Sequence, residues 1–159
     1  MLSFCGQDRC KLDKNGRIKF SPRILNDFKD ACSGNVVLHC LPEGAVAVYP
    51  EDVYLQMRRQ ESRIAERAAG SALFRRNMRR FGAFSQSEVI SSQGRITIPV
   101  AYRDHAKLLT DDEVIVIGVE IGVEIWHPQR WQEEISKIDE YNNLKSEQEI
   151  ALDLRNEQF

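Results

Sequence analysis

The apolar positions of the chain fall into two similar series that follow each other along the sequence. Sliding the sequence by 78 positions aligns residues 13–53 with residues 91–131 without a gap, with seven identities and further coincident apolar positions. Each series begins with two short segments around a glycine turn, continues through a short helix, and ends in an apolar pair of segments rich in β-branched residues. The pattern predicts a duplicated β-hairpin–helix–β-hairpin unit.

The two glycine turns have sequences that specify their geometry. They read DKNGR and, 78 residues later, SSQGR. Asp13 and Ser91 are favoured first residues of a type I turn, and Gly16 and Gly94 supply the left-handed residue that completes a three-residue hairpin loop. We therefore expect both segments to be tight turns between short strands.

Signals for helix starts follow the hairpins. Ser21 before Pro22 is an N-cap followed by proline at the first helical position, and Pro99 opens the corresponding helix of the second unit. The apolar hairpins are expected at residues 36–41 with 45–50, and at residues 114–119 with 123–126. Further helices are expected from Pro50 through Ala68, after Gly70, from Pro128 and after Ser146. The sequence thus predicts an α+β fold with helices after each unit.

The charge distribution adds information that the net charge of −2 hides. Residues 1–80 carry 15 Lys and Arg against 9 Asp and Glu, whereas residues 81–159 carry 7 against 15. Eight arginines and two glutamates lie between Arg58 and Arg80. This asymmetry fits contact with a polyanion, and it equally fits a helix with solvated charges.

Composition and residue spacing argue against several functional classes. No apolar run approaches the ~20 residues of a membrane span, and the N-terminus lacks a signal-peptide pattern, so we expect neither a membrane protein nor a secreted one. The cysteines at positions 5, 10, 32 and 40 match no metal motif, which predicts no metal and no cofactor. No nucleophile–base pair or phosphate-binding glycine loop is present, so we expect no enzyme.

Five segments together carry a family resemblance. They are DKNGR at 13–17, AVAVYPED at 45–52, Arg79-Arg80-Phe81, SSQGRITIP at 91–99 and VEIWHPQRW at 123–131. With their duplication and spacing, they resemble the MraZ family of bacterial transcriptional regulators over about residues 8–135. The D-x-x-x-R motif of that family is intact in the first unit, whereas Ser91 replaces its aspartate in the second.

The resemblance implies a fold and a division of the chain. Two AbrB-type swapped-hairpin half-domains would form a pseudo-twofold β-barrel. The implied parts are the first half-domain at 1–56, an arginine-rich helical connector at 57–82, the second half-domain at 83–131, and an acidic helical C-terminal extension at 132–159.

The resemblance also implies a function. It predicts a sequence-specific DNA-binding regulator, a repressor, that acts in the cytoplasm at the nucleoid. As a ring-shaped homo-oligomer it would bind double-stranded DNA with tandem short repeats upstream of division and cell-wall genes. Carried over by position, Arg17 and Arg95 contact the DNA and Lys14 reaches a phosphate. Four connector arginines face either DNA or a neighbouring subunit: Arg75, Arg76, Arg79 and Arg80.

A second hypothesis remains open on the sequence. The chain could be an antitoxin-like swapped-hairpin module whose C-terminal tail neutralises a protein partner. The duplicated hairpins favour the regulator, and capture of a single toxin-like enzyme would favour the alternative.

Overall fold

The computed structural model describes residues 2–58 and 63–157. Its internal packing separates two units, Met1–His127 and Pro128–Phe159, which we describe one at a time. Residues 59–62 of the predicted connector, and the last two residues of the predicted extension, lie outside the described residues.

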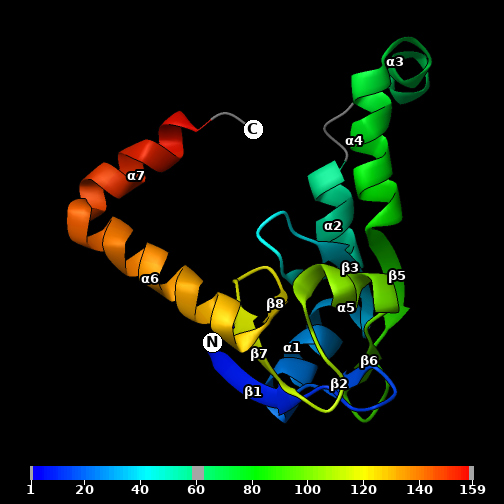
Figure 1. The fold of residues 1–159 in the computed structure, drawn as a ribbon, viewed down its shortest axis with the longest axis vertical. Helices are drawn as coiled ribbons and strands as arrows, with labels where there is room; N and C mark the ends of the chain where they lie inside the picture. The colour runs from blue at the N-terminus through cyan, green and yellow to red at the C-terminus, as the bar shows by residue number, and fades with distance from the viewer. Residues whose placement is uncertain (1, 59–62, 158–159) are drawn as a thin grey trace. The chain divides into compact units, whose positions relative to one another are not determined.

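The first unit contains strands and helices in the order that the sequence predicts (Figure 1). Its strands are β1 (Gln7–Lys11), β2 (Arg17–Lys19), β3 (Asn35–Cys40), β4 (Val46–Pro50), β5 (Ser85–Val89), β6 (Arg95–Thr97), β7 (Glu113–Gly118) and β8 (Val123–Trp126). Its helices are α1 (Pro22–Cys32), α2 (Glu51–Arg58), α3 (Ile64–Gly70), α4 (Ala72–Ala83) and α5 (Val100–Ala106). The second unit contains α6 (Pro128–Leu144) and α7 (Glu147–Asn156). The predicted α+β class is confirmed.

The main sheet is open rather than closed into a barrel. Its order is β1-β7-β8-β4-β3-β5, with antiparallel neighbours, while β2 and β6 pair with each other in a separate two-stranded ribbon. β1 and β5 are therefore edges, and among the described strands the predicted barrel closure is wrong. The physical reason is that β2 and β6, three residues each, form their ladder hydrogen bonds with each other rather than with the edge strands β1 and β5.

The leading strand of each series pairs with the third strand of the other series. β1 pairs with β7 so that Gln7 lies opposite Ile117, and β5 pairs with β3 so that Ser85 lies opposite His39. Ser85 is 78 residues after Gln7, and Ile117 is 78 residues after His39, so the two pairings have the same register.

The two apolar hairpins differ by one residue in their loops. Leu41 donates its backbone N–H to Ala45, whereas Val119 donates to Gly122 across a shorter loop. The gapless alignment of the sequence therefore slips by one residue at this loop, because a deletion in a surface turn leaves the strand pairing intact.

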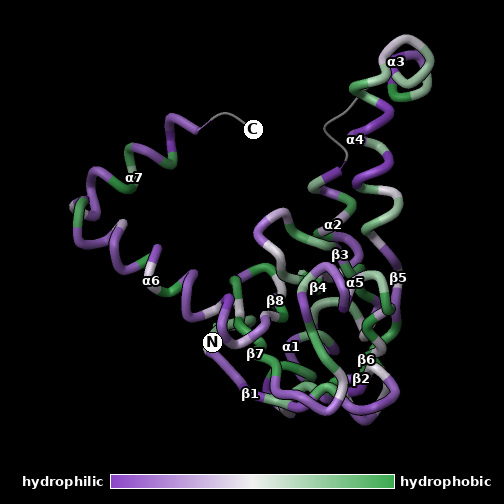
Figure 2. The backbone as a smooth tube through the Cα atoms, viewed as in Figure 1, coloured by the Kyte–Doolittle hydropathy of each residue, from purple (hydrophilic) through white to green (hydrophobic). Residues whose placement is uncertain are grey.

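The core of the first unit lies between the sheet, the ribbon and helices α1 and α5. Both helices contact β3 and β4. Phe28 of α1 is fully buried, and its ring centroid lies 4.7 Å from that of Phe4 and 5.4 Å from that of Phe20. Ile18 and Ile96 enter the same core from the ribbon. Figure 2 shows hydrophobic residues gathered along the sheet strands.

Helices α2, α3 and α4, which we call the arm, extend the first unit beyond its sheet (Figure 1). The predicted continuous helix through Ala68 is wrong, because Arg63 adopts a left-handed φ of 57° between α2 and α3. Ser71 caps α4 by accepting the backbone N–H of Phe74 at 3.0 Å. The Arg58 guanidinium of α2 lies 3.7 Å from the centroid of the Phe81 ring of α4.

The second unit is a pair of helices joined by a short turn. Ser146 caps α7 by accepting the backbone N–H of Glu149 at 3.2 Å, as the sequence predicts. Tyr141 donates its hydroxyl to Asp153 Oδ2 at 3.1 Å, and Lys145 forms an ion pair with the same carboxylate. Hydrogen bonding from Lys145 lowers the pKa of Asp153. These contacts join α6 to α7.

Candidate nucleic-acid interface

The β2–β6 ribbon presents its charged side chains on one exposed face. Its register sets Arg17 opposite Thr97, Ile18 opposite Ile96 and Lys19 opposite Arg95. Because side chains alternate along a strand, the isoleucines enter the core and the other residues face outward. Three cations therefore share one face of a ribbon that is only three residues long on each strand.

Asp13 organises the first turn and its arginine. Its Oδ1 accepts the backbone N–H groups of Asn15 and Arg17, each at 2.9 Å, and its Oδ2 accepts Arg17 Nε at 3.2 Å. The hydrogen bond from the Arg17 backbone is the largest cause of the lowered pKa of Asp13. The carboxylate thus closes the turn and orients the guanidinium.

The second turn closes by a similar bond without a carboxylate. Ser91 Oγ accepts the backbone N–H of Arg95 at 3.0 Å. The side chain of Gln93 accepts a hydrogen bond from the Arg95 guanidinium. A neutral amide therefore holds this arginine, whereas a charged carboxylate holds Arg17.

The two turns are also bonded to the ribbon through their glycines. Gly16 and Gly94 have φ values of 78° and 86°, a region that favours glycine. Phe20 donates its backbone N–H to the Gly94 carbonyl at 2.9 Å, and Ile98 donates to the Gly16 carbonyl at 2.8 Å. Each turn is thereby fixed to the strand of the other series, so the ribbon and both turns form one rigid surface.

Two further cations belong to this surface, and sequence reasoning missed both. Lys19 shares a strand face with Arg17, which the alternation of the RIK segment could have revealed. Arg103 of α5 lies beneath the first turn, where its Cζ is 3.0 Å from the position of a Cβ atom built on Gly16. Arg103 Nε donates to the Ile98 carbonyl at 3.0 Å. No local sequence signal places α5 under the turn. Lys14 is exposed in the same turn.

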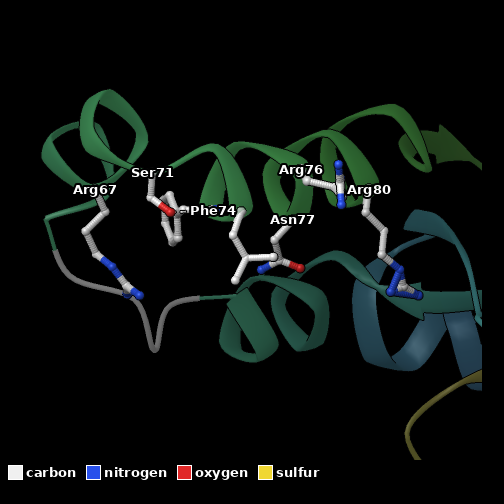
Figure 3. A pocket seen from close by; sticks show the side chains of 7 residues that line it. Arg67, Ser71, Phe74, Arg76, Asn77 and Arg80 are labelled. Atoms are coloured by element: carbon white, nitrogen blue, oxygen red, sulfur yellow. Dashed lines mark hydrogen bonds between the residues drawn. The ribbon is translucent and has the colours of Figure 1, made fainter.

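The arm carries the other predicted arginines, and the structure does not bring them to the ribbon. In Figure 1 the ribbon lies at the end of the sheet opposite α3 and the outer part of α4. Arg75 donates to the Ala68 carbonyl at 2.8 Å, and Arg79 is exposed. Arg76 and Arg80 line a groove with Arg67 (Figure 3). The ribbon and the arm are thus two separate basic surfaces.

The described residues contain no metal-binding group and no membrane-spanning helix. Within residues 2–58 and 63–157, no three His, Cys, Asp or Glu side chains are placed to hold a metal ion. None of the helices in the described part of the chain combines the length and apolar character needed to cross a bilayer.

Fold and site together define an α+β protein that displays a rigid basic ribbon between two closed turns. A family model described as "MraZ protein, putative antitoxin-like" matches residues 88–154. A protein of Nocardioides sp. named Transcriptional regulator MraZ is 33% identical over 132 residues, which cover 83% of this chain and 85% of that relative. Proteins of the same name from Mycobacterium avium and Mycobacterium tuberculosis are 31% and 32% identical over 82% and 81% of this chain, and over 85% and 84% of their own lengths.

The chain belongs to the MraZ family. The family model extends through α6 and most of α7, beyond the limit near residue 135 expected from the sequence motifs. The acidic extension is therefore matched by the family pattern. Sequence reasoning missed this because solvated helices carry few distinctive residues.

Proposed function

We propose that this chain is a sequence-specific DNA-binding transcriptional regulator whose β2–β6 ribbon contacts the double helix. In this proposal Arg17 and Arg95 reach base edges or phosphates, Lys14 reaches a phosphate, and Lys19 adds a second cation beside Arg95. Arginine presents a rigid fork that fits both guanine edges and phosphate oxygens. The naming of relatives as transcriptional regulators supports the same role.

The observation that carries the proposal is the placement of Lys19 directly opposite Arg95. Like charges in facing positions of an antiparallel pair are destabilising. Both side chains are exposed, and Arg17 adds a third positive charge to the same face. A polyanion bound to the ribbon would convert this repulsion into attraction.

We further infer that the fold is a duplicated, swapped-hairpin arrangement with pseudo-twofold symmetry. The equal registers of β1–β7 and β5–β3 support it, as does the self-symmetric register of β2–β6. The half-domains would be residues 1–56 and 83–131, joined by the connector at 57–82 and followed by the extension at 132–159. The pseudo-twofold axis would place the equivalent residues Arg17 and Arg95 on one surface.

We infer that DNA binding requires a ring-shaped homo-oligomer. One ribbon offers only a few contacts, and several ribbons on one assembly would gain affinity by meeting several repeats. The targets would be tandem short repeats in double-stranded DNA upstream of division and cell-wall genes. Bound there, at the nucleoid in the cytoplasm, the protein would repress transcription.

Selection of bound fragments from random double-stranded DNA tests the proposal. The wild-type chain should recover tandem short repeats, whereas the variant Lys19→Gln/Arg95→Gln, which lacks two of the cations that hold the DNA, should retain too little DNA at the same protein concentration to enrich any sequence. The matched control Lys29→Gln/Lys107→Gln removes two exposed cations at α1 and after α5, and it should select the same repeats as the wild type. Equal selection by both double variants would overturn the ribbon as the interface.

The antitoxin-like alternative rests on the description of the matching family model. It predicts that affinity purification captures one toxin-like enzyme in stoichiometric amount, and that random DNA yields no enriched repeat. That pair of results would replace the regulator proposal.

A further inference from the structure

The arm exposes apolar side chains beside its arginines. Leu73 is 76% exposed, Met78 is 36% exposed and Ile64 is 45% exposed. A groove of about 360 Å³ lies between α2 and α4, with Phe74 and Phe81 in its wall. Apolar surface of this kind, within a polar rim, is typical of a surface that binds another protein segment.

A second groove of the arm is strongly basic. It has a volume of about 510 Å³ and lies along α3 and α4. Figure 3 shows Arg67, Phe74, Asn77 and Arg80 along this part of the arm. Residues 63–80 contain six arginines and one glutamate. The arm therefore fits a partner that is both acidic and apolar.

The α6–α7 pair, which we call the extension, has this chemistry. Residues 132–159 contain eight acidic and three basic residues. Ile150 and Leu154 lie one helical turn apart on α7. Glu147 lies three residues before Ile150, and Glu157 lies three residues after Leu154. Leu154 is 60% exposed. An amphipathic helix with such a stripe is the usual occupant of an apolar groove.

We propose that the extension of one copy docks in the arm grooves of a second copy of this chain. Acidic side chains of α7 face arm arginines, and Ile150 and Leu154 cover the apolar groove. DNA is the less favoured partner of the arm, because phosphates would leave Leu73 and Met78 uncovered. The inference rests on the proposed homo-oligomer and names its contacts.

The proposed contact joins two different surfaces, so it is heterologous. A heterologous contact repeats from copy to copy and closes into a ring when the rotation between copies allows. The ribbons are left free, because the arm and the ribbon are separate parts of the first unit. Assembly through the arm would therefore present several ribbons at once.

Charge reversal tests the contact with the full-length chain. One variant carries Arg76→Glu/Arg79→Glu on the arm, and the other carries Glu147→Lys/Glu157→Lys on the extension. Each alone should sediment as a monomer of 18.3 kDa. An equimolar mixture should recover the wild-type mass or another multimer, because each reversed surface then meets its complement on the other variant. Circular dichroism checks that each variant is folded.

Three results would overturn the inference. Assembly of either single variant at the wild-type mass would exclude the arm–extension contact. Recovery of assembly by a chain carrying both reversals, without recovery in the mixture, would place the contact within one chain. Normal assembly of the arm variant with lost DNA binding would assign the arm to DNA. Failure of the proposed function is distinguishable, because the wild type would then assemble without binding DNA.

Discussion

Two arginines at equivalent positions differ in what holds them. The carboxylate of Asp13 accepts a hydrogen bond from the Arg17 guanidinium, while the side-chain amide oxygen of Gln93 accepts one from the Arg95 guanidinium. An exposed ion pair of the first kind adds only about 0–1 kcal/mol of stability, so its value lies in positioning the guanidinium. A neutral amide competes less strongly with phosphate for the second guanidinium.

We predict that Arg17→Ala lowers sequence discrimination. Losing one oriented base contact should cost about 1–3 kcal/mol of discrimination between operator and scrambled DNA. Arg95→Ala should weaken binding to both DNAs about equally and reduce the salt slope of log K by ~0.9, since phosphate contacts carry no sequence information. Titration of both variants against both DNAs measures this, and equal loss of discrimination in both would refute the asymmetry.

Gly118 at the end of β7 is required for a close backbone approach. A Cβ atom there would lie 2.2 Å from the Phe4 carbonyl oxygen. We predict that Gly118→Ala lowers the free energy of unfolding by about 1–3 kcal/mol in urea titrations. Gly82→Ala is the matched control: apart from its chain neighbours and the nearby backbone of α4, no atom of the described residues lies within 4 Å of its Cβ position, so it should gain about 0.5–1 kcal/mol. Equal effects would contradict the close approach.

At the scale of elements, local sequence signals predicted hairpins and helix starts well. The hydrogen bonds by which Asp13 and Gly16 close the first turn and Ser21 caps α1 join atoms within four residues of each other, so the local sequence is sufficient to predict that turn and that helix start. Strand partners depend on distant residues, and the open sheet with a separate ribbon could not be read from periodicity. The alternation of the RIK segment places Lys19 on the same strand face as Arg17, but only the β2–β6 register places it opposite Arg95.

A buried polar cluster links the arm to the sheet. His39 of β3 is buried, its Nδ1 lies 2.8 Å from Ser85 Oγ, and its ring stacks on Phe81 of α4. Tyr54 of α2 donates to the same Ser85 oxygen at 2.6 Å. Burial lowers the pKa of His39, with smaller contributions from Arg80, Arg58 and His105. The neutral imidazole is therefore the form that packs here.

We predict that this cluster makes stability depend on pH. The contribution of His39 is fully present above its ordinary pKa of 6.5 and is lost as the pH falls toward its lower folded value, because the unfolded chain takes up the proton first. Urea unfolding of the wild type and of His39→Asn at pH 7.5 and pH 5 checks this. The acid-induced loss should be smaller in the variant, and an identical loss in both would exclude His39 as its source.

At the scale of the whole molecule, the number of ribbons that meet DNA should determine affinity. A single ribbon carries three outward cations from β2 and β6, which is few compared with the 6–10 phosphate contacts typical of a specific DNA-binding protein. Once one ribbon of an assembly has bound DNA, the binding of each further ribbon to the same DNA is an intramolecular step. Affinity then depends on the spacing and number of repeats rather than on net charge.

We predict that the assembled protein distinguishes operators by repeat number and that a monomer does not. Wild-type affinity should rise at least tenfold from one repeat to three, since each added ribbon binds at high effective concentration. The variant Arg76→Glu/Arg79→Glu retains every ribbon residue. As a monomer it should bind three repeats only about three times more tightly than one repeat, because it can occupy any one of three equivalent sites. Binding titrations with duplexes of equal length, in which repeats are replaced by scrambled sequence, keep the nonspecific contribution constant. A monomer that binds three repeats as tightly as the wild type would show that one ribbon is sufficient, and it would contradict the prediction that tight binding requires assembly.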